Sequence, residues 1–172
     1  MAENILENLA AHARERVAEA KKKISLDEMK ERAFAVQERE EFAFEKALTG
    51  EGIHFICECK KASPSKGLIA ADFPYLDIAK EYEAAGASAI SVLTEPKWFL
   101  GRNEYLAEIA STVNIPVLRK DFTVDEYMIF EAKALGASAI LLICSLLGRE
   151  ELTNFMNIAD GLGLSALVEA HD

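Results

Sequence analysis

The chain has 172 residues, 51% hydrophobic and 28% charged, enough for one domain with a sizeable core. Its formal net charge of −10 argues against a nucleic-acid-binding surface, although a cleft with local lysines still admits an anionic small molecule. No apolar run is long enough to span a membrane, and the charged N-terminus lacks an apolar export core. We therefore expect a cytoplasmic protein with no nucleic-acid or membrane partner.

Residues 1–48 are expected to form an N-terminal helical extension. The pattern predicts one helix near the start and a second around residues 34–48, with a junction near residues 25–27. We interpret the extension either as a surface appendage or as a cap over one end of the structure that follows. The apolar positions that indicate the first helix are Ile5, Leu9, Ala13 and Val17.

Apolar segments alternate with helical patterns through the rest of the chain. Gly86-Ala87-Ser88-Ala89-Ile90 recurs at residues 136–140 and, more loosely, at 163–167. Glycine at these positions suits a helix C-terminus, because it tolerates the left-handed conformation that ends a helix. Strict alternation with nearly continuous apolar strands predicts an α/β fold with a parallel sheet covered by helices. The five predicted strands, separated by four helices, lie near residues 54–60, 88–94, 116–120, 138–143 and 165–170.

Three of these helices carry recognisable signals. Pro74 fits the first position of a helix, and Thr123 with Glu126 predicts a capping box for another. A third amphipathic pattern covers residues 149–160.

Length bears on how much of a fold is present. A complete (β/α)8 barrel needs roughly 250 residues, or about 30 for each strand–helix unit. Residues 49–172 supply four such units and one further strand, so we expect a partial (β/α) barrel truncated after its fifth strand. A complete five-stranded flavodoxin-like domain is the alternative, which we disfavour because no helix follows the last strand.

Charged residues lie at the ends of three predicted strands. Glu58 and Lys60 share one strand face because side chains alternate, while Lys120 and Glu169 end two later strands. Burying such charges is costly unless they are paired or functional. Charged groups that converge from the ends of parallel strands are how a (β/α) barrel builds its active site.

Each candidate residue also has a simpler explanation. Lys120 alone fits a strand-end lysine paired with Asp121, Glu169 fits a helix-facing ion pair, and residues 63–65 fit a turn. Their joint occurrence at strand ends favours a site. We assign His12 and Trp98 no role beyond packing or solvent exposure.

The three cysteines are expected to be buried free thiols that face the helix layer. Cys57 and Cys59 lie two apart on one strand face, which does not favour a disulfide, and no set of further ligands accompanies them or Cys144.

Residues 58–67 (Glu-Cys-Lys-Lys-Ala-Ser-Pro-Ser-Lys-Gly) closely resemble the signature of the indole-3-glycerol phosphate synthase family. Arg102 departs from the family pattern, which often has a small residue after Gly101. The likeness continues, with order and spacing preserved, through residues 91–96, 99–101, 116–122 and 167–171.

The resemblance implies a (β/α)8-barrel lyase of tryptophan biosynthesis, which needs no metal or cofactor. Its substrate is the anionic, phosphorylated 1-(2-carboxyphenylamino)-1-deoxyribulose 5-phosphate, which undergoes ring closure with decarboxylation and dehydration. By the same resemblance, Lys120 is the general acid, Lys60 binds the substrate carboxylate, and Glu169 transfers a proton during dehydration. Glu58 orients the lysines. The expected substrate-binding residues are Lys60, Ser63, Phe99 and Phe122.

Two further expectations follow from the predicted truncation. Barrels of this kind usually bind phosphate with loops after strands seven and eight, so we expect the 172-residue chain alone to be inactive. Unpaired edges on its first and fifth strands are expected to promote self-association. The alternatives are another phosphate-binding (β/α)8 enzyme, such as an isomerase with an Asp or Cys acid–base pair, and a non-catalytic half-barrel module.

Overall fold

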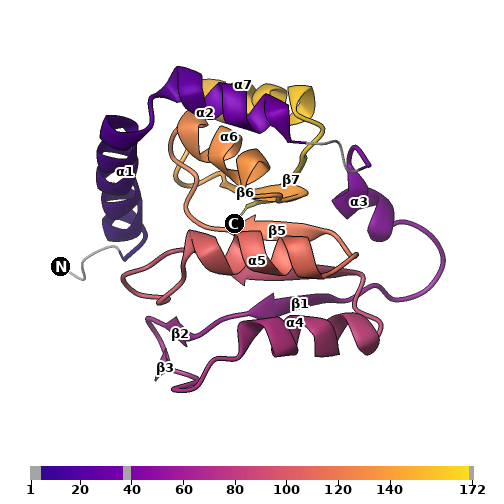
Figure 1. The fold of residues 1–172 in the computed structure, drawn as a ribbon. Coiled ribbons are helices and arrows are strands. Elements are labelled where there is room, and N and C mark those ends of the chain that lie inside the picture. The colour runs from indigo at the N-terminus through magenta and orange to yellow at the C-terminus, as the bar shows by residue number, and fades with distance from the viewer. Residues whose placement is uncertain (1–4, 37–39, 171–172) are drawn as a thin grey trace.

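The computed structural model describes residues 5–36 and 40–170 as helices packed on a parallel sheet (Figure 1). Residues 1–4 of the predicted extension, 37–39 of its predicted second helix, and 171–172 at the end of the predicted barrel segment lie outside this part. No helix among the described residues is both long and apolar enough to cross a membrane.

The sheet has five parallel strands in the order β1-β4-β5-β6-β7, which confirms the predicted α/β fold and all five predicted strands. Consecutive large strands are therefore neighbours, with one helix in each connection, as in a (β/α) barrel. The strands are β1 (Ile56–Cys59), β4 (Ala89–Leu93), β5 (Val117–Lys120), β6 (Ala139–Ile143) and β7 (Ser165–Glu169).

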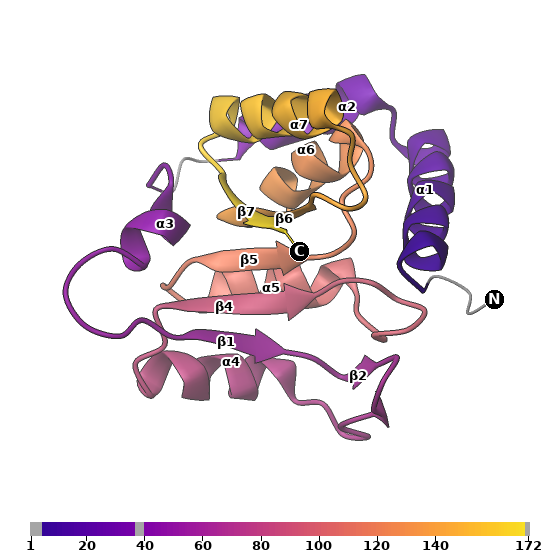
Figure 2. The same cartoon turned by 180° about the vertical axis from the view of Figure 1, so that it is seen from behind.

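The four connecting helices cover one face of this curved sheet, and Figure 2 looks onto the face that they leave open. Gly86 and Gly136 follow two of them with φ angles of 90° and 86°, which confirms the predicted left-handed helix ends. Alternation within each strand sends Ile90, Val117 and Ile140 into the core beneath the helices. The helices are α4 (Tyr75–Ala84), α5 (Asn103–Thr112), α6 (Glu126–Ala134) and α7 (Arg149–Gly161).

The starts of two connecting helices test the sequence signals. Pro74 immediately precedes α4, one position earlier than predicted. The predicted capping box at Thr123 is wrong, because α6 begins at Glu126 and Asp125 is its N-cap. The Asp125 carboxylate accepts a hydrogen bond from the backbone N–H of Tyr127, whereas Thr123 is buried two residues before the cap.

The N-terminal segment contains α1 (Ile5–Lys23), α2 (Leu26–Ala35) and α3 (Ala43–Ala47). The first predicted helix is confirmed, but a single second helix over residues 34–48 is wrong. The predicted junction near residues 25–27 is confirmed, because α1 ends at Lys23 and Ser25 is the N-cap of α2. The Ser25 hydroxyl accepts the backbone N–H of Glu28 at 3.2 Å. Helix α2 then packs on α6, where the rings of Phe34 and Phe130 lie 6.3 Å apart.

Helix α3, which leads into β1, is attached to the opposite edge of the sheet. The backbone N–H of Phe42 donates to the carbonyl oxygen of Gly163 at 2.9 Å, and the N–H of Glu45 donates to Ser165 Oγ at 3.3 Å. Both acceptors lie at or just before the start of β7, so this contact links the chain entering the first strand with the last strand.

A short antiparallel pair, β2 (Ala62–Ser63) and β3 (Gly67–Leu68), is joined by the turn that the sequence indicates at residues 63–65. Figure 2 shows β2 just beyond the carboxyl end of β1. The Ser63 hydroxyl accepts the backbone N–H of Lys66 at 3.2 Å, so this serine stabilises the turn.

The cysteines are free, but only one is buried. Cys59 packs in the core beneath the helices, and burial, followed by the charges of Cys57 and Glu58, raises its pKa to about 12. Cys57 and Cys144 are half-buried, which corrects the expectation that all three are buried.

Candidate active site

A cavity of about 200 Å³ lies at the carboxyl ends of the strands. Helix α1 also contributes to it, since Leu6 lines its wall, and Figure 2 shows α1 beside this end of the sheet. This placement agrees with the interpretation of the extension as a cap. The lining residues are Leu6, Glu58, Lys60, Leu93, Phe99, Lys120, Asp121, Phe122, Leu141, Ile143 and Glu169.

The four candidate catalytic residues all line this cavity, and strand alternation explains how. Glu58 lies in β1 with Lys60 one residue beyond its end, while Lys120 and Glu169 are the last residues of β5 and β7. Because parallel strands end at one edge, these side chains converge although they come from three strands. Phe99 and Phe122 also line the cavity, whereas Ser63 is not among its lining residues.

Glu58 is the common partner of the two lysines. Its Oε1 lies 2.7 Å from Lys60 Nζ, and its Oε2 lies 3.3 Å from Lys120 Nζ. Burial acts to raise the pKa of Glu58, but the Lys60 hydrogen bond and the charges of Lys120 and Lys60 outweigh it, so this pKa is lowered. The carboxylate is therefore ionised at neutral pH and holds both ammonium groups at the cavity.

Two of the simpler explanations do not describe the structure. Lys120 pairs with Glu58, while Asp121 binds Arg16 of α1 at 2.7 and 3.1 Å. The half-buried Glu169 lines the cavity, so it does not belong to the helix-facing side of β7.

The cavity also offers an apolar surface next to its charges. The rings of Phe99 and Phe122 lie 6.1 Å apart at an interplanar angle of 42°. Leu93 and Ile143 contribute aliphatic side chains from the ends of β4 and β6, and Leu141 contributes one from the middle of β6. An aromatic ring can bind against such a surface while its polar groups reach the charged residues.

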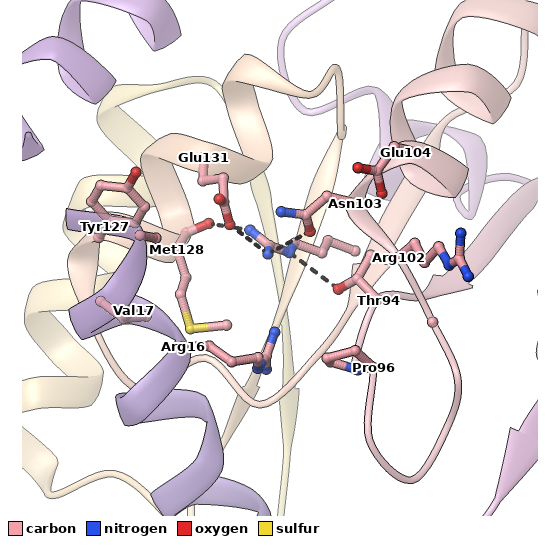
Figure 3. Close-up of a pocket in the computed structure, with 13 residues that line it drawn as sticks. Arg16, Val17, Thr94, Pro96, Arg102, Asn103, Glu104, Tyr127, Met128 and Glu131 are labelled. Atoms are coloured by element: carbon pink, nitrogen blue, oxygen red, sulfur yellow. Dashed lines mark hydrogen bonds and ion pairs between the residues drawn. The ribbon is translucent and has the colours of Figure 1, made fainter. Parts of the chain in front are cut away.

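Arg119, one residue before Lys120, points to the opposite face and fastens β5 to the helix layer. This buried guanidinium donates to Glu131 at 2.6 Å and to the Met128 carbonyl oxygen at 2.9 Å. It also bonds to Asn103 and Thr94. Figure 3 shows these partners around a separate cavity of about 270 Å³, with Arg16 of α1 on its border.

Two buried carboxylates, Asp121 in the cavity lining and Glu95 outside it, were not predicted as functional residues. Asp121 follows β5 and accepts hydrogen bonds from Arg16, Thr94 Oγ1 and the backbone N–H of Phe122. Burial acts to raise its pKa, but the charges of Arg16 and Arg119 outweigh burial and lower it. Glu95, close after β4, has a side chain with no exposed surface. Both carboxylates bind α1, a long-range contact for which the sequence carries no local signal.

Parallel strands whose carboxyl ends bring lysines and glutamates to one cavity define the active-site region of a (β/α)-barrel enzyme. The indole-3-glycerol phosphate synthase family model matches residues 6–172. The chain belongs to this family, which confirms the resemblance seen in its motifs.

Curated relatives support the same assignment. Over 168 residues, the chain is 57% identical to the indole-3-glycerol phosphate synthase of Ruminiclostridium cellulolyticum and 53% identical to that of Endomicrobium trichonymphae. Each alignment covers 98% of this chain and 65% of the relative. The protein of the same name from Lachnoclostridium phytofermentans is 48% identical over 179 residues, which cover 98% of this chain and 66% of that protein. The chain thus spans just under two thirds of the length of these relatives.

Proposed function

We propose that this chain carries the catalytic residues of an indole-3-glycerol phosphate synthase of tryptophan biosynthesis. The substrate is 1-(2-carboxyphenylamino)-1-deoxyribulose 5-phosphate, an anionic phosphorylated small molecule. The observation that carries the proposal is the shared carboxylate of Glu58, which holds Lys60 and Lys120 at one cavity with Glu169. Membership of the family supplies the reaction class.

The proposed roles follow the chemistry of ring closure. Lys120 donates a proton to the substrate carbonyl oxygen while the aromatic carbon that bears the carboxylate attacks the carbonyl carbon. Lys60 binds this carboxylate until the group leaves as CO2. The electrons of the broken carbon–carbon bond then restore the aromatic ring. The attack closes the five-membered ring, and Glu169 then transfers the proton that accompanies loss of the new hydroxyl group as water, which forms the carbon–carbon double bond of that ring.

The remaining cavity residues are proposed to position the substrate and the lysines. Glu58 orients both ammonium groups, and Phe99 and Phe122 contact the aromatic ring of the substrate. Correct orientation of reacting groups accounts for a large part of catalysis in bond-forming reactions, so both contributions are expected to affect turnover.

Activity is best tested in a chimeric enzyme. In this chimera, residues 1–172 are followed by the part of the Ruminiclostridium cellulolyticum relative that lies beyond the matched region. We expect the purified chimera to convert the substrate, measured as the rise of indole fluorescence. A folded chimera without turnover would contradict the proposal, and the 172-residue chain assayed in parallel tests the expectation that it is inactive alone.

We also propose that residues 1–48 act as an extension of a partial barrel formed by residues 49–172, in a cytoplasmic protein. Self-association of the chain is proposed to use the edge strands β1 and β7, each of which has one neighbour in the sheet. Exposed apolar side chains accompany both edges, including Phe55, Ile56, Leu167 and Val168. Sedimentation velocity at several concentrations measures this association, and a strictly monomeric chain would contradict it.

A further inference from the structure

Two side chains that lie one turn apart on α1 each reach a carboxylate at the end of a different strand. His12 Nδ1 lies 3.2 Å from Glu95 Oε1, and Arg16 Nη2 lies 2.7 Å from Asp121 Oδ1. Both carboxylate side chains are completely buried. A buried carboxylate is stable only when hydrogen bonds and opposite charge replace its hydration, so α1 supplies part of what each one needs.

Glu95 determines the path of the loop that follows β4. Its carboxylate accepts the backbone N–H groups of Lys97, Trp98 and Phe99 at 2.7–3.1 Å. Its own carbonyl oxygen accepts the N–H of Gly101 at 2.8 Å, which closes the loop. The ring of Phe99 therefore reaches the cavity from a loop that is folded around one carboxylate.

Asp121 has the equivalent role after β5. Its Oδ1 accepts the backbone N–H of Phe122 at 2.8 Å and also binds Arg16. The two carboxylates thus hold the backbone of the two phenylalanines whose rings contact each other in the cavity. Neither His12 nor Arg16 lines that cavity, so each acts through its carboxylate partner.

We infer that His12 and Arg16 are positioning residues for the aromatic pair Phe99–Phe122, acting through Glu95 and Asp121. The inference rests on the proposed function in one respect, namely that this pair binds the aromatic ring of the substrate. By fixing both loops, α1 sets the position of the Phe99–Phe122 surface against which that ring packs. Loss of either contact then weakens substrate binding more than it slows the chemical steps.

The same helix provides a matched control. Lys21 of α1 binds Asp125 at 2.7 Å, but this pair is about one third exposed, and neither residue lines the cavity. Asp125 caps α6 through Tyr127 and holds neither phenylalanine. Lys21→Met therefore removes an ion pair between α1 and the N-cap of α6 without removing a contact to Glu95 or Asp121.

The first readout uses the 172-residue chain itself. Its single tryptophan, Trp98, lies in the Glu95 loop, with its ring 5.4 Å from the imidazole of His12. We expect His12→Ala to shift Trp98 emission and to increase acrylamide quenching, while Lys21→Met leaves both unchanged. In His12→Asn, an amide N–H near the position of Nδ1 restores the contact to Glu95, so its quenching should return toward wild type.

The second readout is steady-state kinetics of the chimeric enzyme. We expect Arg16→Met and His12→Ala each to raise KM by about tenfold with a smaller change in kcat. Arg16→Lys should recover part of the loss, and Lys21→Met should resemble wild type. Far-ultraviolet circular dichroism confirms that each variant is folded.

The outcomes separate the two proposals. If the unsubstituted chimera is active but Arg16→Met and His12→Ala change KM no more than Lys21→Met does, the positioning role is wrong while the enzyme assignment stands. An unchanged Trp98 signal in His12→Ala also contradicts the positioning role. If the folded chimera is inactive but Trp98 responds as expected, the proposed function fails while α1 still controls the loop.

Discussion

Lys120 and Glu58 form a hydrogen bond of 3.3 Å although they are 62 positions apart in the sequence. They also come from strands that are not neighbours, because β4 lies between β1 and β5. The bond therefore passes over the carboxyl end of β4, at the mouth of the sheet. Lys60 binds the other oxygen of the same carboxylate, so one residue of β1 fixes two cations at the cavity.

Replacement of Lys120 by methionine should lower kcat of the chimeric enzyme by roughly 10² to 10⁴, the usual contribution of one acid–base group. Methionine keeps most of the side-chain volume but removes the proton donor. Lys46→Met is the control, since Lys46 belongs to α3 and pairs with the exposed Glu40 away from the cavity. Near-wild-type turnover of Lys120→Met would remove Lys120 from its proposed role.

The stabilising effect of Asp121 should depend on pH. Its pKa is lowered from the ordinary 3.8 because, although burial opposes ionisation, Arg16 and Arg119 favour the carboxylate. The contribution is thus complete above the ordinary pKa and is lost as pH falls through the lower pKa of the folded state.

Urea unfolding of wild type and Asp121→Asn measures this effect. At pH 7 we expect the variant to be less stable by about 3 kcal/mol, as for a broken buried ion pair, and the difference should shrink below about pH 4. Asp77→Asn should show little difference at any pH, because the Asp77 side chain is 75% exposed. A difference for Asp121→Asn that grows as pH falls would contradict the assigned direction.

Arg119→Met should destabilise the chain by about 3–5 kcal/mol, because it leaves Glu131 and the Met128 carbonyl oxygen without their buried donor. Arg32→Met removes an exposed pair with Glu28 on α2 and should cost no more than about 0.5 kcal/mol. Free energies of unfolding from urea titrations compare the two, and similar values would show that Arg119 is not an anchor of β5.

Gly101→Ala should destabilise the fold, because a Cβ atom at this position would lie only 2.7 Å from the carbonyl carbon of Leu93 and 2.8 Å from that of Thr94. These are backbone atoms at the end of β4, so relief requires a backbone shift that costs about 1–3 kcal/mol. Gly161→Ala has open space at the end of α7 and should be neutral or stabilising by up to about 1 kcal/mol. Thermal unfolding of the two variants provides the comparison.

Local patterns were sufficient to predict the sheet, because its strands are short apolar runs bounded by turn residues. The repeat that begins at Gly86 and recurs at Gly136 placed two strands directly, and the glycines have the expected left-handed conformation. Helix starts were harder to predict. Thr123 and Asp125 are both good caps, and packing of the buried Thr123 decides against it.

Strand parity and the family motifs predicted the charged residues of the cavity. They did not predict the contacts from α1 that support it. His12 was assigned no role, and Arg16 was not singled out, because their partners lie 83 and 105 positions away in the sequence. Such contacts depend on where α1 docks, and no periodicity records that. Ser63 does not line the cavity and its hydroxyl accepts a hydrogen bond within a turn, so its role in substrate binding stays a prediction.

The bond from Glu45 to Ser165 spans 120 positions. During synthesis, the backbone N–H of Glu45 therefore cannot donate to Ser165 until β7 has left the ribosome. Until then, the segment that leads into β1 lacks this attachment. Such distant contacts slow folding, since a long loop must close before they form. The attachment of α3 to β7 is therefore expected to form late in folding.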